Sequence, residues 1–135
     1  MRLKPPKFIR WLMPDLIWEM KDRSAVYLTF DDGPTPGITE WILSTLDKYD
    51  AKATFFVLGK NVEMYPDLYQ RILDAGHRVG NHTYSHQKGW GMSLERYTED
   101  VDFANDLVHS ELFRPPYARI TPAQARFLGQ RYKLV

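Results

Sequence analysis

The strongest constraint on the fold is a regular alternation of short β-type and helical segments after residue 24. Residues 25–30 and 52–58 are rich in β-branched and aromatic types, and helical apolar spacing follows each of them. Further strands are expected at residues 77–81, 111–114 and 132–135. Repeated strand–helix units with right-handed crossovers build a parallel sheet. The pattern therefore predicts an α/β fold, open and doubly wound or barrel-like, with four strands and the start of a fifth.

Capping residues mark where the helices begin. Thr35-Pro36 is a suitable N-cap with a first-turn proline, while Ser93 and Thr121 are suitable N-caps for two later helices. The first of these helices is expected to bury one face with helical spacing, formed by Ile38, Trp41, Ile42, Thr45, Leu46 and Tyr49. A length of 135 residues favours one domain.

Composition limits the classes of partner and cofactor. Hydrophobic residues make up 44% of the chain, which is enough to build a core. The formal net charge of +1 gives no electrostatic case for binding nucleic acid. The sequence has no cysteine, so disulfides and thiolate metal sites are excluded. A transition metal would therefore have to bind histidine, aspartate or glutamate.

Residues 1–23 are predicted to form an N-terminal arm that precedes the domain at residues 24–135. The arm is basic and then apolar, but Pro14, Asp15 and Glu19 interrupt the apolar run. We expect no transmembrane segment and no cleavable signal peptide, which leaves a cytoplasmic or envelope-associated location open. Packing of the arm's apolar residues on the domain is favoured over an interfacial membrane anchor; these residues are Phe8, Trp11, Leu12, Ile17 and Trp18.

Three polar clusters each follow a predicted strand. Asp31 and Asp32 follow the first strand, His82 and His86 the third, and residues 114–117 the fourth. The carboxyl ends of parallel strands lie at one edge of a sheet, where active sites of such folds are found. The clusters are therefore expected to converge.

Each cluster has a functional and a structural interpretation. Adjacent carboxylates repel, so a divalent cation would stabilise Asp31 and Asp32, although aspartate is also common in turns. A spacing of four puts His82 and His86 on one face of a helical turn, as zinc ligands or as surface histidines. Arg114 could pair with a carboxylate or form a surface ion pair. The two prolines that follow stiffen the strand exit and are candidates for a cis bond.

Together the motifs resemble the polysaccharide deacetylases, also called the NodB-homology domain or carbohydrate esterase family 4. The matching strings are Thr29-Phe30-Asp31-Asp32-Gly33-Pro34, His82-Thr83-Tyr84-Ser85-His86 and Arg114-Pro115-Pro116-Tyr117. The resemblance covers residues 24–135. It implies a partial, irregular (β/α) barrel and a hydrolase that removes N-acetyl groups from an N-acetylated oligo- or polysaccharide.

The resemblance also implies residue roles. Asp31 would be the general base and Arg114 its partner, and Thr83 would brace the histidine loop. A divalent metal, most often zinc, would be bound by Asp32, His82 and His86. The backbone N–H of Tyr117 would stabilise the oxyanion. His77 and His109 match no motif and are interpreted as structural.

The resemblance is incomplete in ways that leave alternatives open. The late Leu-x-His motif that supplies the general acid in the family has no counterpart before Val135, and Ala118 stands where glycine is usual. A sheet of four or five strands is expected to expose an apolar edge at its last strands, which would favour self-association. The alternatives are an inactive truncated fragment that keeps the metal half-site, and a same-fold hydrolase of a non-sugar amide.

Overall fold

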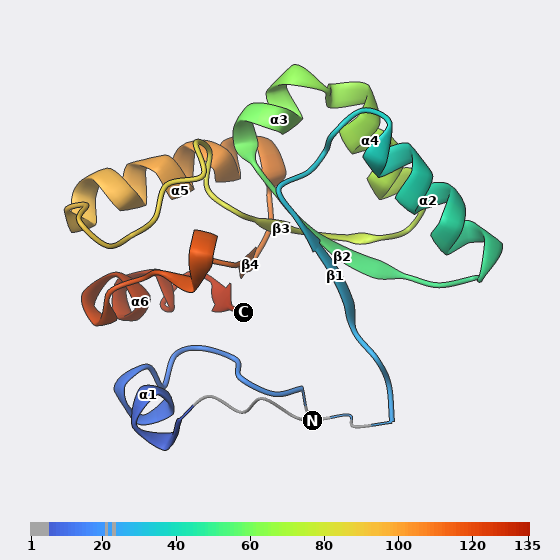
Figure 1. Ribbon diagram of the computed structural model, residues 1–135. Coiled ribbons are helices and arrows are strands. Elements are labelled where there is room, and N and C mark those ends of the chain that lie inside the picture. Colours follow the sequence, from blue (N-terminus) through green and yellow to red (C-terminus); the bar gives the residue numbers. More distant parts are fainter. Residues whose placement is uncertain (1–5, 21, 23) are drawn as a thin grey trace.

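The computed structural model of the chain describes residues 6–20, 22 and 24–135 (Figure 1). Its helices and strands follow in the order α1 (Lys7–Leu12), β1 (Leu28–Asp31), α2 (Ile38–Lys48), β2 (Ala53–Val57), α3 (Gly59–Met64), α4 (Pro66–Asp74), β3 (Arg78–Asn81), α5 (Leu94–Val108), β4 (Leu112–Phe113), a 3-10 turn (Pro116–Ala118), α6 (Pro122–Leu128) and β5 (Lys133–Leu134). All five predicted strands are present, each within about three residues of its expected ends. No described helix is long and apolar enough to cross a membrane.

The strands form one parallel sheet in the order β1-β2-β3-β4-β5. Right-handed crossovers between consecutive neighbours place the connecting helices on the same face of a sheet, as in a barrel. Figure 1 shows α2, α3, α4 and α5 on one side of the sheet. A doubly wound sheet would reverse its strand order at a switch point, and this sheet does not. The fold is therefore the partial barrel type.

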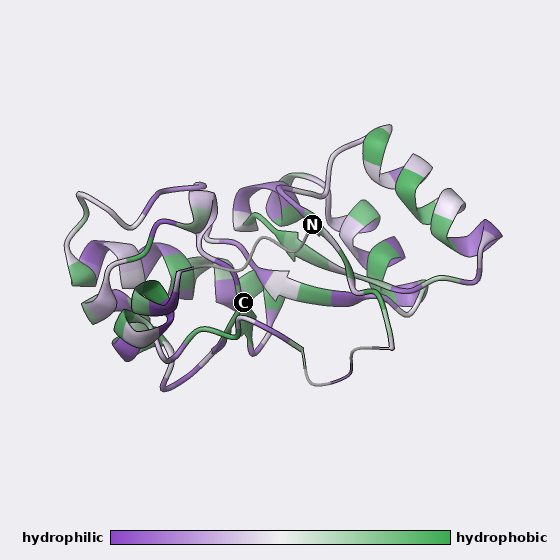
Figure 2. Ribbon diagram, turned by 60° about the horizontal axis from the view of Figure 1, so that its bottom comes forward, coloured by the Kyte–Doolittle hydropathy of each residue, from purple (hydrophilic) through white to green (hydrophobic). Residues whose placement is uncertain are grey.

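Two apolar clusters hold the helices on the sheet. The first lies between β2 and helices α2, α3 and α4, where Phe55, Val57 and Ile72 are almost fully buried. The second joins α5, β4, α6 and β5 around Phe113 and Leu128. The covering helices carry separate hydrophobic and hydrophilic stripes (Figure 2). Because each cluster uses alternate strand residues, the other side chains of the strands remain free to form a site.

Helix α2 differs from its predicted start and predicted face. It begins at Ile38 after Gly37, whereas Thr35 lies before the helix and its backbone N–H bonds the Thr39 hydroxyl. Leu46 is buried and Ile42 packs against the first apolar cluster as predicted, but Ile38, Trp41 and Tyr49 are exposed, and Thr39 and Leu43 are buried in their place. Both sets have helical spacing, so periodicity alone could not choose between them. Contacts with the first apolar cluster decide which face turns inward.

The N-terminal arm packs through other residues than expected. Met13 and Leu16 contact the second apolar cluster, whereas the Phe8, Trp11, Leu12 and Ile17 side chains are exposed. The Trp18 side chain is partly buried, and its indole N–H donates to the Met13 carbonyl at 3.1 Å. Residues 1–5, 21 and 23 of the predicted arm lie outside the described residues. The boundary between arm and domain at residue 24 remains a prediction.

The arm also changes which sheet edge is open. Leu16 forms a parallel bridge with Leu134, and the backbone N–H of Ile17 donates to the Leu134 carbonyl at 2.7 Å. The edge at β5 is therefore covered, contrary to the expectation of an exposed edge at the last strands. At the opposite edge, Val26, Tyr27 and Leu28 are exposed. Self-association through a sheet edge remains a prediction.

Candidate metal centre

The turn after β1 points two adjacent carboxylates in different directions. Asp31 is the last residue of β1, and Asp32 has a positive φ of 70°. This left-handed conformation costs aspartate less than most residues. The Asp32 N–H donates to the Phe56 carbonyl at 3.1 Å, and the Asn61 side-chain amide donates to the Asp32 carbonyl at 2.8 Å. The turn is therefore held from both sides, and its carboxylates can serve separate partners.

The two histidines lie on the loop that follows β3. Thr83 and His86 both have positive φ values, 68° and 61°. The Thr83 hydroxyl accepts a hydrogen bond from the His86 N–H at 3.0 Å. The imidazole rings have centroids 5.4 Å apart. The loop thus brings both rings to the Asp32 carboxylate. It does so through left-handed backbone conformations, which a spacing of four residues does not indicate.

Asp32, His82 and His86 form a compact donor set. Their three ligand atoms all lie within 4.8 Å of one another. The Asp32 carboxylate oxygen is 3.4 Å from His82 Nε2 and 3.0 Å from His86 Nε2. Ligand atoms about 2.1 Å from a tetrahedral ion lie about 3.4 Å apart, so these separations fit one ion. One carboxylate with two imidazoles also suits zinc and its transition-metal neighbours. The residues present therefore fit a divalent metal.

The environment of His82 favours the form that binds a metal. Its side chain is 4% exposed, and Nδ1 lies 2.6 Å from the Arg114 carbonyl. A proton on Nδ1 donated to that carbonyl leaves the Nε2 lone pair directed at Asp32. Burial lowers the pKa of His82, against the opposite effect of the Asp31 and Asp32 carboxylates and of the Arg114 carbonyl. The ring is therefore held neutral and oriented.

Arg114 reaches the other carboxylate of the pair. Its Nη1 donates to Asp31 Oδ1 at 2.8 Å and to the Thr29 hydroxyl at 2.9 Å. The guanidinium carbon lies 4.0 Å from the centroid of the Phe56 ring. That ring in turn lies against Gly80, where an added Cβ would be 2.5 Å from ring carbons. Arg114 is thus supported by a stacked ring and placed between β1 and β4.

Tyr117 closes the site beyond β4. It has a positive φ of 57° within the 3-10 turn, and its ring centroid lies 4.7 Å from that of His86. The Ala118 N–H donates to the Pro115 carbonyl at 3.1 Å, which shapes the turn. Ala118 adopts a positive φ of 52° there, the conformation for which glycine is better suited. The cis bond considered for the prolines of this segment is found instead at Gly33-Pro34.

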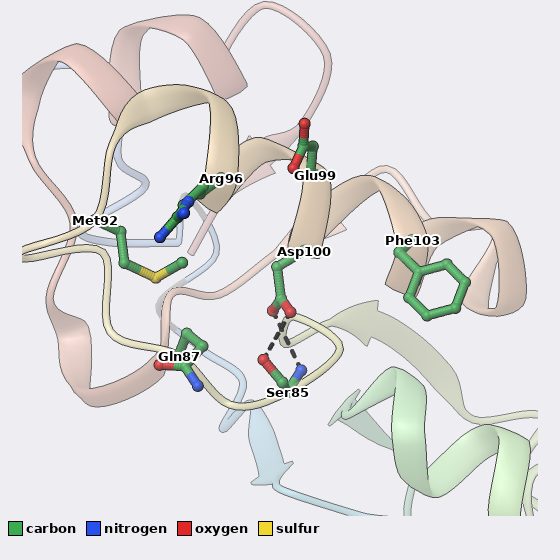
Figure 3. A pocket seen from close by; sticks show the side chains of 7 residues that line it. All are labelled: Ser85, Gln87, Met92, Arg96, Glu99, Asp100 and Phe103. Atoms are coloured by element: carbon green, nitrogen blue, oxygen red, sulfur yellow. Dashed lines mark hydrogen bonds between the residues drawn. The ribbon is translucent and has the colours of Figure 1, made fainter.

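Two buried or half-buried residues that motif reasoning missed support the histidine loop. The Asn81 side chain accepts from the Thr83 N–H and donates to the Val101 carbonyl, both at 2.8 Å. The Asp100 carboxylate accepts from the N–H and the hydroxyl of Ser85, at 3.2 and 2.6 Å (Figure 3). It also accepts from the Tyr84 N–H at 3.1 Å. Helix α5 therefore fixes the loop that carries His86.

Replacing Asp100 with alanine is expected to weaken zinc binding by about 10–100-fold, the usual cost of losing a partner that orients a ligand. Both donors of Ser85 lose their acceptor, and the Tyr84 N–H keeps only the Asp100 backbone carbonyl at 3.2 Å, so His86 is held less firmly. Calorimetric titration with Zn²⁺ measures the change. Asp106→Ala is the matched control, since Asp106 is exposed on the same helix. Equal affinities in the two variants would contradict the assigned support.

The stability of the metal-free chain is expected to fall as the pH drops below about 6.5, the ordinary pKa of histidine. Folding lowers the pKa of His82, mainly by burial, so the unfolded chain takes up a proton that the folded chain resists. Urea unfolding at pH 7.5 and 5.5 with a chelator tests this. The drop should be smaller in His82→Asn than in the exposed control His109→Asn, and equal drops would count against it.

The remaining histidines lie away from the donor set. His77 immediately precedes β3, and His109 precedes β4, so both are at the amino edge of the sheet. His77 is buried with its ring centroid 5.4 Å from that of Phe55. His109 is the C-cap of α5 in a left-handed conformation. Both positions match the structural interpretation made from the sequence.

A comparison of the sequence with family profiles agrees with the parallel α/β fold and with the site at the edge of its sheet. The sequence profile of the polysaccharide deacetylase family matches residues 19–132. The chain therefore belongs to that family, as the resemblance indicated.

The similar proteins include two peptidoglycan deacetylases. The peptidoglycan-N-acetylmuramic acid deacetylase PdaC of Bacillus subtilis is 39% identical over 105 residues, 73% of this chain and 22% of the relative. The crystal structure of the Bc1960 peptidoglycan N-acetylglucosamine deacetylase has a TM-score of 0.82 and 34% identity, covering 84% of this chain and 56% of that one. A family 4 acetyl xylan esterase from Clostridium thermocellum, in complex with a cobalt ion, has a TM-score of 0.68 at 33% identity, covering 73% and 51%. The chain thus spans about a fifth of the first relative and about half of each structure.

Proposed function

We propose that this chain carries the metal and base residues of a hydrolase that removes N-acetyl groups from the amino sugars of a glycan. One observation carries the proposal. The donor set of Asp32, His82 and His86 lies beside the ion pair of Asp31 and Arg114 at the carboxyl edge of the sheet. Metal-dependent hydrolysis needs an electrophile and a base side by side.

Asp32, His82 and His86 would hold the divalent metal, and zinc is the favoured ion because of the two imidazole donors. When bound, the metal would supply a Lewis acid that polarises the acetyl carbonyl and lowers the pKa of its water. The side chain of Asp32 is 59% exposed, whereas that of His82 is almost covered. This difference leaves the site open on the side from which a glycan would approach.

Asp31 would accept the proton of the attacking water. Arg114 fixes its Oδ1 at 2.8 Å, and a cation also neutralises the repulsion between adjacent carboxylates. The water oxygen then bonds to the acetyl carbon, and the carbonyl oxygen gains negative charge. The backbone N–H of Tyr117 is the proposed donor to that oxygen, because Tyr117 lies in a left-handed turn and its ring is beside that of His86.

The final step breaks the carbon–nitrogen bond and releases acetate. The departing nitrogen must gain a proton to leave as an amine. His77 and His109 precede their strands and lie at the opposite edge of the sheet, so neither is assigned this role. The proton donor is therefore proposed to come from outside the described residues of this chain.

The substrate class is proposed from the relatives' names. Two of the relatives named above are a peptidoglycan-N-acetylmuramic acid deacetylase and a peptidoglycan N-acetylglucosamine deacetylase. Peptidoglycan is therefore the first substrate to test, and the choice between its two amino sugars is left to experiment. The non-sugar amide hydrolase remains the alternative within the same fold.

Asp31→Asn is expected to lower acetate release by about 100-fold or more, since general-base catalysis contributes about 10²–10⁴-fold. The assay measures acetate released from peptidoglycan and from N-acetylglucosamine oligomers by the zinc-loaded chain. Asp47→Asn is the control, because Asp47 is exposed on α2. A ureide in the same panel tests the alternative substrate class.

Each unexpected result of this assay supports a different alternative. A folded, zinc-loaded chain that releases no acetate would support the inactive fragment that keeps the metal half-site. Turnover of the ureide without acetate release would favour the non-sugar amide hydrolase. Turnover of both glycans that persists in Asp31→Asn would remove Asp31 from its proposed role.

A further inference from the structure

Helix α1 turns an apolar face to solvent. Phe8, Trp11 and Leu12 are 68%, 81% and 50% exposed. Their spacing of three and four residues puts them on one face of the helix. Soluble domains usually bury such a face, and contiguous exposed apolar groups mark binding sites.

The other side of the arm is already occupied. Met13 and Leu16 pack on the second apolar cluster, and Ile17 bonds the edge of β5. The Asp15 side chain lies near Gly129 after α6, where an added Cβ would be 3.2 Å from Asp15 Cβ. Packing within the chain therefore accounts for the inner side of the arm and leaves the apolar face of α1 without a role.

The arm is also set apart by its charge. The first 12 residues contain four of the 18 basic residues of the chain, at positions 2, 4, 7 and 10, and none of the 17 acidic ones. Lys7 is exposed next to Phe8. Arg10 pairs with Glu19 at 3.5 Å. The exposed apolar face thus lies in the most basic part of a chain whose net charge is only +1.

We propose that the face formed by Phe8, Trp11 and Leu12 binds the surface of an anionic lipid membrane. Aromatic side chains favour the boundary between headgroups and acyl chains, and nearby lysine and arginine are attracted to anionic lipids. The face lies outside residues 19–132, which match the family profile. Attachment is peripheral, and it does not depend on the proposed catalytic function.

The test is sedimentation of the full chain with vesicles. Vesicles of phosphatidylglycerol and phosphatidylcholine are compared with pure phosphatidylcholine vesicles, at low and high salt. We expect binding to the anionic vesicles, weakened by salt because exposed charges are screened. Phe8→Ser/Trp11→Ser/Leu12→Ser is expected to bind at least about tenfold more weakly. The single variant Trp11→Ser should also bind the anionic vesicles more weakly, and it alters the chain less.

A matched control removes similar apolar groups elsewhere. Ile38→Ser/Trp41→Ser/Tyr49→Ser alters three exposed residues of α2 and should keep wild-type binding. Equal loss in both triple variants, or equal binding to neutral and anionic vesicles, would overturn the proposal. So would a dimer in sedimentation velocity that the α1 variants convert to a monomer, since the face would then bind a second copy.

Discussion

Replacing His82 with alanine is expected to lower the affinity of the chain for Zn²⁺ by more than about 100-fold. Loss of a partner that only orients a ligand already costs about 10–100-fold, and this change removes a ligand itself. His82 is also the most constrained donor of the set, because burial and the Arg114 carbonyl fix its ring. The wild-type chain should bind one Zn²⁺ in calorimetric titration.

His109→Ala is the control for this titration, since His109 is exposed at the end of α5. It should bind zinc as the wild type does. Circular dichroism establishes that both variants keep the fold. If His82→Ala binds zinc as tightly as the control, the donor set is not the metal site, and the proposed chemistry loses its electrophile.

Phe113→Ala is expected to lower the free energy of unfolding by about 3–5 kcal/mol, the usual cost of removing a buried phenylalanine ring. Phe113 is fully buried in β4. Its ring centroid lies 6.3 Å from that of Tyr97 and 5.9 Å from that of Tyr132. The cavity would open between α5 and β5, next to the residue that holds Asp31. Urea denaturation measures the change.

Phe103→Ala provides the comparison, because Phe103 is half exposed and its ring centroid lies 4.4 Å from that of Tyr84. Its loss should cost clearly less than that of Phe113. Similar costs for the two variants would mean that the second apolar cluster contributes little to stability. Zinc binding by Phe113→Ala at low denaturant then reports whether the strand still positions Arg114.

The sequence was sufficient for the parts of the fold that depend on local pattern. Strand–helix alternation predicted the parallel sheet, and the polar residues after β1, β3 and β4 lie at one edge because parallel strands share a direction. Ser93 and Thr121 cap α5 and α6 as predicted, through side chains that accept from the third residue of each helix. These features need no knowledge of tertiary contacts.

Features set by tertiary contacts were not predictable. Two faces of α2 have helical spacing, and only packing against β2 selects Leu43 over Trp41. The histidine loop uses left-handed residues at Thr83 and His86, which the spacing of four does not reveal. Asp100 acts on that loop from 14 residues beyond His86, a separation at which no motif links them.

The order of the strands also sets the order in which the site is assembled during synthesis. Each strand pairs with the one made just before it, so the sheet can grow from its amino-terminal side as the chain leaves the ribosome. The three donor residues have all been synthesised once His86 is added to the chain. The carbonyl that orients His82 belongs to Arg114 and follows 28 residues later. The growing chain therefore contains all three metal-ligand candidates before it contains Arg114, whose carbonyl orients the His82 ring.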